Sequence, residues 1–561
     1  MAALRMIGLL LLSNEAIADA RPNIVLMMAE DLSSRIGAFG DSVAVTPNID
    51  RLANEGVRYT NVFTTAGVCA PSRAATIMGA HAISFGAQHM RTSGKNYKTV
   101  PPPDMKAYPE LLRKQGYYTL TDGKLDYQFS GTMSGSGPFT IWDKEGRKVG
   151  IKDAPIHQPF FAQLNFMVTH ESGIFPPLGN WPHSITHFIM QVLRPFMGRT
   201  SKPVESINAE NISIEPYYPD TPTVRQDILR HYHNITAMDA EVGSVLSYLS
   251  ETGLDDNTIV IWTTDHGDGL PRAKRELYDS GIKVPMIIRW PERFRPRHIM
   301  PGSMDSQLIS FVDLAPTIMA MAQIQPTVKN SHTGEKSSSR SEGRFQGRDI
   351  IGATAKRHYV FASRDRIDEV PDRQRAIRDA RFKYIRSYHP NQEGGHRLNF
   401  RENIPMVREM FELLLAGKLN KDQQLWFQAP GEERLFDLKN DPHELRNIVE
   451  DPDYKADLVR LRTALDERLS EIGDLSGQSE NEMRDSFLVS GEQGLTAAPK
   501  LSVDDAAVTL TSIDSASIGY RINSGDWQLY TQALMLQEDD KLDAKAQRYG
   551  WLESKIVSWE Y

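Results

Sequence analysis

The chain of 561 residues contains a single cysteine, Cys69. One cysteine excludes a disulfide bond within the chain, whichever compartment the protein works in. A lone thiol is most often a small buried hydrophobic residue. Cys69 becomes a candidate for chemistry only if the residues around it support a reaction.

Long apolar runs are also missing, since no stretch reaches the roughly 20 residues that a membrane-spanning helix needs. The first residues do hold a short apolar run, 6–12, after Arg5, and Ala18 and Ala20 form a small-x-small pattern. This combination is typical of a signal peptide over residues 1–20, and the alternative is a frayed N-terminus. We therefore expect a protein exported to a bacterial periplasm or secreted, with no membrane span.

Positive charge is in short supply, because 64 Lys and Arg face 72 Asp and Glu and give a formal net charge of -8. Such a balance disfavours nucleic acid as a partner, so any anion must be bound by local positive groups. Hydrophobic residues at 40% and charged residues at 24% are typical of a globular protein. The length predicts one large catalytic domain with at least one smaller unit.

Strand and helix patterns alternate in the first half of the chain. Residues 23–29 and 258–264 are predicted strands, each followed directly by polar residues, and 227–252 has the apolar spacing of a helix. This alternation predicts an α/β fold with helices on both faces of a sheet. The polar pairs Glu30-Asp31 and Asp265-His266 would then lie at the carboxyl ends of strands, where sites gather.

The second half has a different character. Residues 327–344 are polar and predict a surface loop, whereas 383–387 and 434–438 are strand-like and 454–472 is helical. We predict a catalytic domain over 21–348, a smaller α+β subdomain over 349–475 and a small β-sandwich tail over 476–561.

Cys69 opens the sequence Cys69-Ala70-Pro71-Ser72-Arg73, which precedes a predicted helix over 74–80. Proline is tolerated in a first helical turn, and the free N–H groups there stabilise negative charge. The residues alone leave two interpretations open, a nucleophilic thiol of low pKa and a buried structural thiol.

This motif resembles the signature of the formylglycine-dependent (type I) sulfatases, whose cysteine is oxidised to an aldehyde by a maturation enzyme. Further matches follow in the order of that family: Glu30-Asp31, 46–50, Gly123-Lys124, Thr169-His170, 264–267 and 274–285. The resemblance covers about residues 21–469. It implies an alkaline-phosphatase-like mixed sheet sandwiched by helices.

The resemblance also implies a mechanism. Hydrated formylglycine would attack the sulfur, and a hard divalent cation, Ca²⁺ or alternatively Mg²⁺, would favour its alkoxide form. The positions that match the family's metal ligands are Glu30, Asp31, Cys69, Asp265 and His266. The positions that match its other catalytic residues are Arg73, Lys124, His170 and Lys274. Here Arg73 would hold the nucleophile, both lysines would bind sulfate, and His170 would protonate the leaving alcohol.

Three positions depart from the family pattern, and two more extend it. Glu30 stands where aspartate is common, and His266 where some sulfatases have asparagine. Asp126 replaces the histidine that many sulfatases have two residues after the lysine, which leaves its role open. His89 and Arg91 resemble pocket residues of some polysaccharide sulfatases. We take His89, Arg91 and Asp126 as candidate substrate-binding residues, and a solvated loop is the alternative for the first two.

We thus expect a sulfatase acting on a sulfated poly- or oligosaccharide. Two alternatives stay open: a phosphonate or phosphodiester hydrolase on the same scaffold, and a saccharide-binding protein with a degenerate site, suggested by Asp126 and the tail. A cysteine-thiolate hydrolase is disfavoured, because no histidine is implied beside Cys69.

Overall fold

The computed structural model describes residues 21–92, 97–324, 345–352, 356–504, 507–513 and 515–560. The predicted signal peptide and the predicted loop 327–344 lie outside the described residues. Among the described residues, no helix combines the length and the apolar composition needed to cross a bilayer.

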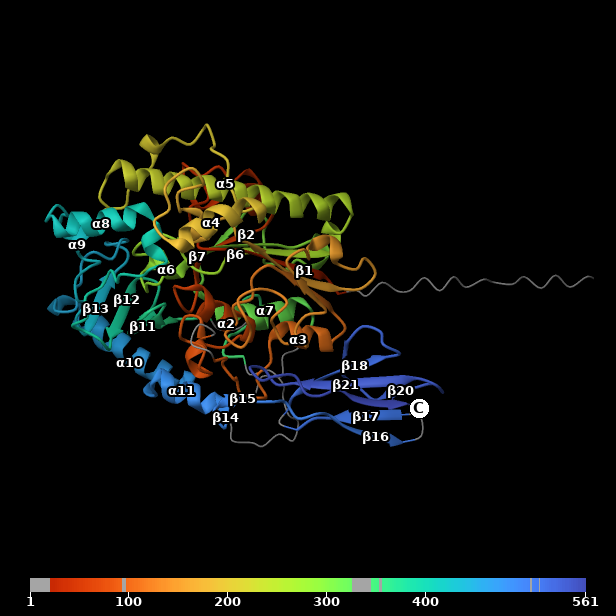
Figure 1. Cartoon of the computed structure of the whole chain (residues 1–561). Helices are drawn as coiled ribbons and strands as arrows, with labels where there is room; N and C mark the ends of the chain where they lie inside the picture. Colours follow the sequence, from red (N-terminus) through yellow and green to blue (C-terminus); the bar gives the residue numbers. More distant parts are fainter. Residues whose placement is uncertain are drawn as a thin grey trace, which may run out of the picture.

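A mixed sheet forms the centre of the molecule (Figure 1). Among the described residues its order is β4-β3-β5-β1-β6-β7-β2-β8, with β9 paired to β2. β1 runs parallel to β5 and β6, whereas β7 runs antiparallel to β6 and β2. The bounds are β1 Asn23–Ala29, β2 Val57–Phe63, β3 Tyr118–Asp122, β4 Lys144–Gly146, β5 Phe160–Phe166, β6 Thr258–Thr264, β7 Lys283–Arg289, β8 Met304–Asp305 and β9 Ile309–Ser310.

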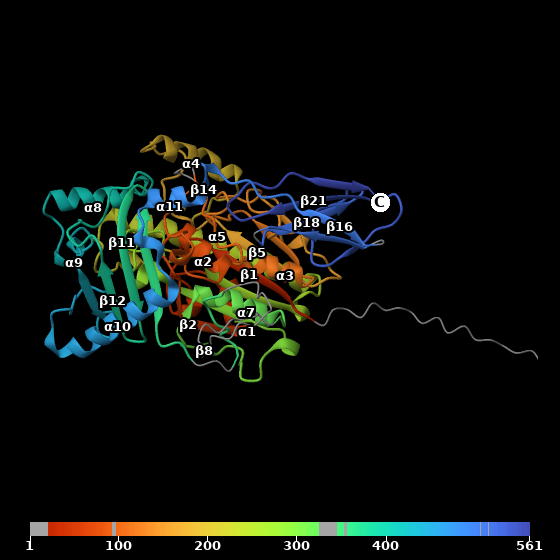
Figure 2. The ribbon, with the colours of Figure 1, turned by 90° about the horizontal axis from the view of Figure 1, so that it is seen from below.

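Helices cover both faces of this sheet (Figures 1 and 2). Val25 and Met27 of β1 pack in one core with α1 (Pro47–Glu55) and α5 (Pro222–Glu251). Ile24 and Leu26 pack in a second core with α2 (Cys69–Met78), α3 (Tyr108–Lys114) and α7 (Leu314–Met321). Because successive strand residues point to opposite faces and both faces are covered, the buried β1 is apolar from residue 24 to residue 29. The predicted fold class is confirmed.

A four-stranded antiparallel sheet follows, with the order β10-β11-β12-β13. Its strands are β10 Val360–Ile367, β11 Val370–Arg378, β12 Phe382–Ser387 and β13 Glu433–Asp437. α10 (Lys455–Ile472) buries Leu461 and Leu465 against Phe361 and Tyr384 of this sheet. The remaining helices are α4 Ile185–Phe196, α6 Asp279–Ile282, α8 Pro405–Leu415, α9 Lys421–Gln424 and α11 Glu480–Phe487.

The C-terminal part consists of short antiparallel strands. One sheet has the order β16-β17-β20, and the other has the order β19-β18-β21-β22. Val508 and Leu534 of the first share a core with Ile518 and Leu542 of the second, which is the packing of a β-sandwich. The bounds are β14 Leu488–Val489, β15 Glu492–Gln493, β16 Lys500–Asp504, β17 Ala507–Thr511, β18 Ser517–Ile522, β19 Gln528–Leu529, β20 Leu534–Met535, β21 Lys541–Gln547 and β22 Val557–Glu560. The domain boundaries at 348 and 475 stay predictions.

Two helices begin earlier than their apolar spacing predicts. α5 starts at Pro222, where Thr221 caps it by accepting a hydrogen bond from the Val224 N–H. α2 starts at Cys69 itself rather than at Ala74.

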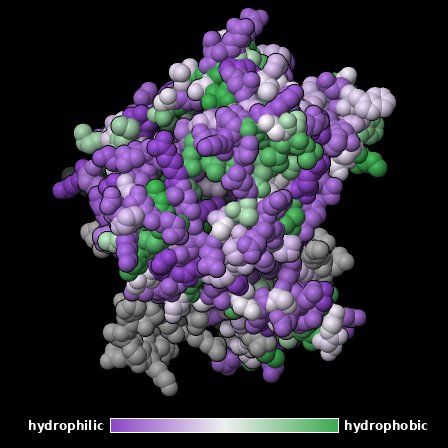
Figure 3. All heavy atoms as spheres, turned by 90° about the vertical axis from the view of Figure 1, so that its left-hand side faces the viewer, coloured by the Kyte–Doolittle hydropathy of each residue, from purple (hydrophilic) through white to green (hydrophobic). Residues whose placement is uncertain are grey.

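On the side of the molecule where α8 and α9 lie, the surface is mostly hydrophilic, with a hollow bordered by a few hydrophobic patches (Figure 3).

Candidate active site

The carboxyl ends of β1 and β6 bring two predicted pairs together. Glu30 and Asp31 follow β1, Asp265 and His266 follow β6, and all four side chains are fully buried. The Asp31 N–H donates to Oδ1 of Asp265 at 3.1 Å, which ties the two strand ends to each other. Parallel pairing of β1 with β6 therefore produces the polar cluster that the sequence predicts at this edge.

Cys69 points into this cluster from the first residue of α2. Its Sγ lies 3.3 Å from Nε2 of His266 and 3.9 Å from Oδ1 of Asp31. The same Asp31 oxygen is 3.1 Å from His266 Nε2. The expectation that no histidine stands beside Cys69 is therefore wrong, because the end of β6 brings His266 to the start of α2. Ser72 fixes the helix start, because its hydroxyl donates to the Asp265 carbonyl at 2.6 Å. A helix N-terminus beside the thiol favours negative charge at this position.

The donor set fits a hard divalent cation. Ligand atoms of Asp31, Cys69, Asp265 and His266 lie within 4.8 Å of one another, and so do those of Glu30, Asp31, Cys69 and His170. Carboxylate oxygens with one imidazole are ligands that such cations accept. Four of the five predicted metal ligands share the first group, and Glu30 stands in the second.

Arg73 compensates the buried carboxylates. Its guanidinium pairs with Oε1 of Glu30, donates from Nε to Oδ2 of Asp265 at 3.1 Å, and donates from Nη1 to Oδ1 of Asn165 at 2.8 Å. Burial alone would lower the pKa of Arg73, but Glu30 and Asp265 raise it. Burial raises the pKa of Glu30, whereas Asp265 is held down at a pKa of about 2 by His266, Arg73 and Lys124 against its own burial.

The two predicted sulfate-binding lysines approach the cluster from different elements. Nζ of Lys124 lies 2.5 Å from Oε2 of Glu30, and Nζ of Lys274 lies 2.5 Å from Oδ2 of Asp31. Both lysines are about 1% exposed. Burial opposes their positive charge, yet the neighbouring acidic groups raise the pKa of each, so both stay protonated.

His170 is the fifth predicted catalytic residue in the cluster. Its Nε2 lies 3.5 Å from Nζ of Lys274, and its Nδ1 lies 3.0 Å from the Ser172 hydroxyl. Burial, with Lys274 next, lowers the pKa of His170 well below its usual range, which favours the neutral imidazole. The structure thus brings all nine predicted catalytic and metal-binding residues together, while their individual roles stay predictions.

The predicted substrate residues border one side of the cluster. Oδ2 of Asp126 lies 3.8 Å from both Nζ of Lys124 and Nε of Arg91, and the Arg91 side chain is 35% exposed. His89 is buried, its Nδ1 accepts from the Arg366 N–H at 3.3 Å, and burial lowers its pKa to about 4. Arg91 is therefore the one of the three that a ligand reaches most easily.

Left-handed backbone conformations concentrate around this site. Non-glycine residues rarely adopt positive φ, and such strain collects at functional sites. The residues of this kind in or beside the cluster are Asp31 at 48°, Arg91 at 49°, Asp126 at 57°, Arg275 at 77° and Asp368 at 44°.

Sequence reasoning missed several polar residues of the site. Asn165 ends up beside Arg73 because β5 pairs with β1, and Glu171 and Arg275 directly follow the predicted His170 and Lys274. Glu171 is fully buried, and Arg275 and Lys274 hold its pKa at about 2 although burial opposes this. Adjacency to predicted residues was the only signal for the last two.

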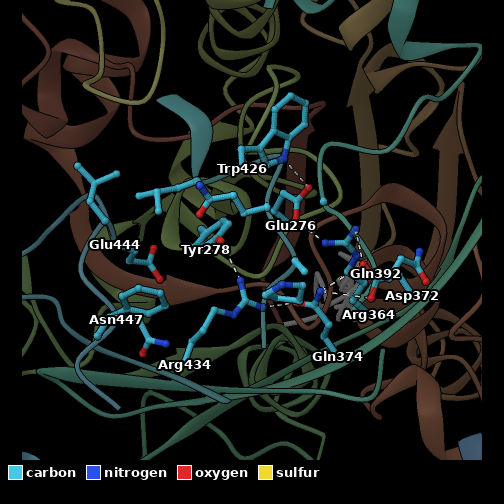
Figure 4. Close-up of a pocket in the computed structure, with 17 residues that line it drawn as sticks. Glu276, Tyr278, Arg364, Asp372, Gln374, Gln392, Trp426, Arg434, Glu444 and Asn447 are labelled. Carbon is cyan, nitrogen blue, oxygen red and sulfur yellow. Dashed lines mark hydrogen bonds and ion pairs between the residues drawn. The ribbon is translucent and has the colours of Figure 1, made fainter. Parts of the chain in front are cut away.

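A cavity of about 200 Å³ lies against the second sheet (Figure 4). None of the predicted site residues lines it. Its wall is a network in which Arg364 pairs with Glu276 and Asp372, and Arg434 donates to the Tyr278 hydroxyl at 2.8 Å. Trp426 donates from Nε1 to Glu276 at 2.9 Å. Most of the charged groups in this wall are paired with one another, and we assign the cavity no ligand.

Comparison with known proteins identifies the family. A model of the sulfatase family matches residues 22–324, and a model of the N-sulphoglucosamine sulphohydrolase C-terminal region matches residues 272–398. An ulvan-active sulfatase of Formosa agariphila is 37% identical over 567 residues, covering 96% of this chain and 91% of that protein. Human N-sulphoglucosamine sulphohydrolase is 26% identical, covering 80% of this chain and 89% of that protein.

The fold agrees with these matches. A solved structure described as a 2-O GAG sulfatase has a TM-score of 0.54 and 19% identity, covering 83% of this chain and 96% of that one. The chain therefore belongs to the sulfatase family and is an enzyme that hydrolyses sulfate esters.

Proposed function

We propose that the protein hydrolyses sulfate esters of a poly- or oligosaccharide, with a formylglycine made from Cys69 as the nucleophile. The observation that carries this proposal is the placement of the Cys69 Sγ. It lies at a helix N-terminus, 3.3 Å from His266 Nε2, inside a buried cluster that also holds the carboxylates of Glu30, Asp31 and Asp265 and three cations. A structural thiol would need none of these groups.

A divalent cation would be held by Asp31, Asp265 and His266 around residue 69, with Glu30 on the Arg73 side. When bound, the cation would lower the pKa of a hydroxyl on the formylglycine and polarise a sulfate oxygen. Calcium is our first assignment and magnesium the alternative, because the ligands are mainly carboxylate oxygens.

The surrounding residues then have distinct tasks. Arg73 favours the charged forms of Glu30 and Asp265 and fixes their orientation, since its guanidinium bonds to both. Lys124 and Lys274 supply the positive charge that a sulfate group requires in an acidic protein. His170 is our proposed proton donor to the leaving oxygen. Because its imidazole is neutral and its Nε2 lies 3.5 Å from the Lys274 ammonium, it would take up a proton, for example from Lys274, before passing it on.

A saccharide is the proposed substrate class for two reasons. Both the Formosa agariphila relative and the human relative are named for sulfated saccharides. In addition, Arg91 and Asp126 present one exposed and one buried polar group beside Lys124, which suits a sugar that carries hydroxyl and anionic groups. Export to the periplasm or the medium, where such polymers occur, and conversion of Cys69 by a maturation enzyme belong to the same proposal.

The test compares esters on one preparation of protein made together with a maturation enzyme. We expect turnover of 4-nitrophenyl sulfate, and a higher kcat/KM on ulvan or glycosaminoglycan oligosaccharides than on the aryl ester. Release of sulfate is measured by ion chromatography, with Cys69→Ala as the inactive control. Faster turnover of phosphonate or phosphodiester analogues would favour the rival hydrolase, and saccharide binding without any turnover would favour a degenerate binding protein.

A further inference from the structure

Behind Lys274 lies a chain of charges that alternate in sign. Nζ of Lys274 is 2.9 Å from Oε1 of Glu171, and Arg275 donates to both Glu171 oxygens at 2.9 Å. Nε of Arg275 in turn donates to Oδ2 of Asp368 at 2.6 Å. The side chains of Lys274, Glu171 and Arg275 are 1–2% exposed and that of Asp368 is 16% exposed. Because these charges are buried, each one depends on its neighbours of opposite sign for compensation.

Lys274 lies between two carboxylates, those of Asp31 and Glu171. Lys274 touches Asp31 on one side at 2.5 Å and Glu171 on the other at 2.9 Å. The Glu171 N–H also donates to the same Asp31 oxygen at 2.7 Å. Without the Glu171 carboxylate, Lys274 would pair with Asp31 alone, and both groups would be drawn away from a sulfate or cation between them.

The last member of this row of charges, Asp368, belongs to the predicted C-terminal subdomain. Asp368 stands in the two-residue turn between β10 and β11. Ile367 at the end of β10 pairs with Val370 at the start of β11. Asp368 and Arg275 both have positive φ, at 44° and 77°. The two-residue turn accounts for the positive φ of Asp368, whereas that of Arg275 is an unfavourable conformation in a residue whose guanidinium is held by Glu171 and Asp368.

We propose that Glu171, Arg275 and Asp368 are positioning residues that hold the Lys274 ammonium at the sulfate-binding position. The proposal deepens the function proposed above and rests on it. It assigns the β10–β11 turn a part in the reaction, although none of its residues belongs to the motifs that the family resemblance provides.

The test uses Glu171→Gln and Asp368→Asn, which remove charge and keep shape. We expect kcat/KM for 4-nitrophenyl sulfate to fall roughly 10- to 100-fold in Glu171→Gln and by a smaller factor in Asp368→Asn, as for other groups that orient ligands from behind. In a Lys274→Ala background, Glu171→Gln should have no further effect, because the group it positions is gone.

Asp474→Asn is the matched control. Asp474 accepts from Nε of the buried Arg375 at 2.9 Å, and its side chain is also 16% exposed. The other partners of Arg375 are Asp365, Ser476 and two backbone carbonyls rather than catalytic or metal-binding residues. We expect wild-type kcat/KM for this variant. Equal losses in Asp474→Asn and Asp368→Asn, or the same fold-loss for Glu171→Gln with and without Lys274, would refute the positioning role.

A second readout separates this idea from the proposed function. Inorganic sulfate should raise the melting temperature of the holoenzyme, and Asp368→Asn should need several-fold more sulfate for half of the effect. A wild type that binds sulfate but hydrolyses no ester would refute the proposed function, and the sulfate dependence would still decide on the positioning chain. If Asp368→Asn needed the same sulfate concentration as wild type for half of the effect, the positioning role would be refuted.

Discussion

Arg73 is a buried arginine whose guanidinium serves three acceptors at once, on Glu30, Asp265 and Asn165. Each of the two carboxylates is fully buried, so removing the guanidinium leaves negative charge in a medium that solvates it poorly. The buried carboxylates of the site therefore need compensating positive charge, and Arg73 supplies it to two of them.

Arg73→Met should lower the free energy of unfolding by about 3–5 kcal/mol, because it removes the guanidinium that Glu30 and Asp265 share, although Lys124 still pairs with Glu30. Denaturant unfolding followed by fluorescence measures this loss. Arg484→Met, which breaks the surface pair with Asp485, is the control and should unfold close to wild type. Equal stability of the two variants would show that Arg73 is not the compensating group.

The residues of the site could be predicted to different degrees. Cys69, Arg73 and the two strand-end pairs stand in short local motifs, and the structure brings them together. Glu171 and Asp368 could not be predicted, because their importance arises from ion pairs with Arg275. In the sequence, Glu171 lies 104 residues and Asp368 lies 93 residues from Arg275. Nothing in a single sequence shows which carboxylate will face which arginine.

The end of β6 is the element on which the site depends most closely. Gly267 follows His266, and a Cβ at this glycine would stand 1.9 Å from the Ser280 carbonyl oxygen just before β7. Since backbone atoms cannot yield easily, only glycine fits between β6 and α6. This close approach holds His266 beside Cys69.

Gly267→Ala should therefore cost about 1–3 kcal/mol of unfolding free energy through overpacking, and it should lower kcat by displacing His266. Gly477→Ala is the control, because a Cβ there meets nothing within 4 Å. Thermal melts and turnover of an aryl sulfate give both numbers. Wild-type behaviour of Gly267→Ala would mean that the β6 end moves freely.

Elements were predictable where their pattern was local. Strands 23–29 and 258–264 match β1 and β6 to the residue, because each has a continuous apolar run, 24–29 and 259–262, as strands buried on both faces do. The start of α5 was missed by five residues, since capping by Thr221 rather than apolar spacing decides it. The antiparallel position of β7 depends on long-range pairing that no local pattern encodes.

At the scale of the whole molecule, the terminal β-sandwich is joined to the catalytic domain through a buried acid. Oε2 of Glu110 on α3 accepts from the Tyr549 hydroxyl at 2.6 Å, and Oε1 accepts from the Ser517 hydroxyl. The ring of Tyr549 also stacks on Phe129 at 5.0 Å. Figures 1 and 2 both place α3 beside this sandwich.

Glu110→Ala should loosen this joint, because it leaves the Tyr549 and Ser517 hydroxyls buried without an acceptor, at about 1–3 kcal/mol each. Limited proteolysis should then cut the chain near residues 490–500 faster than in wild type. Glu145→Ala, at a half-buried carboxylate of the same domain that does not contact the sandwich, is the control. Unchanged proteolysis would mean that apolar packing alone holds the sandwich in place.

The central claim is that Cys69 becomes the formylglycine nucleophile, and the mass of the tryptic peptide containing residue 69 tests it most directly. For protein produced with an active maturation enzyme, we predict a peptide about 18 Da lighter than the cysteine form. An unmodified thiol under the same conditions would contradict the catalytic account and favour a saccharide-binding protein with a degenerate site.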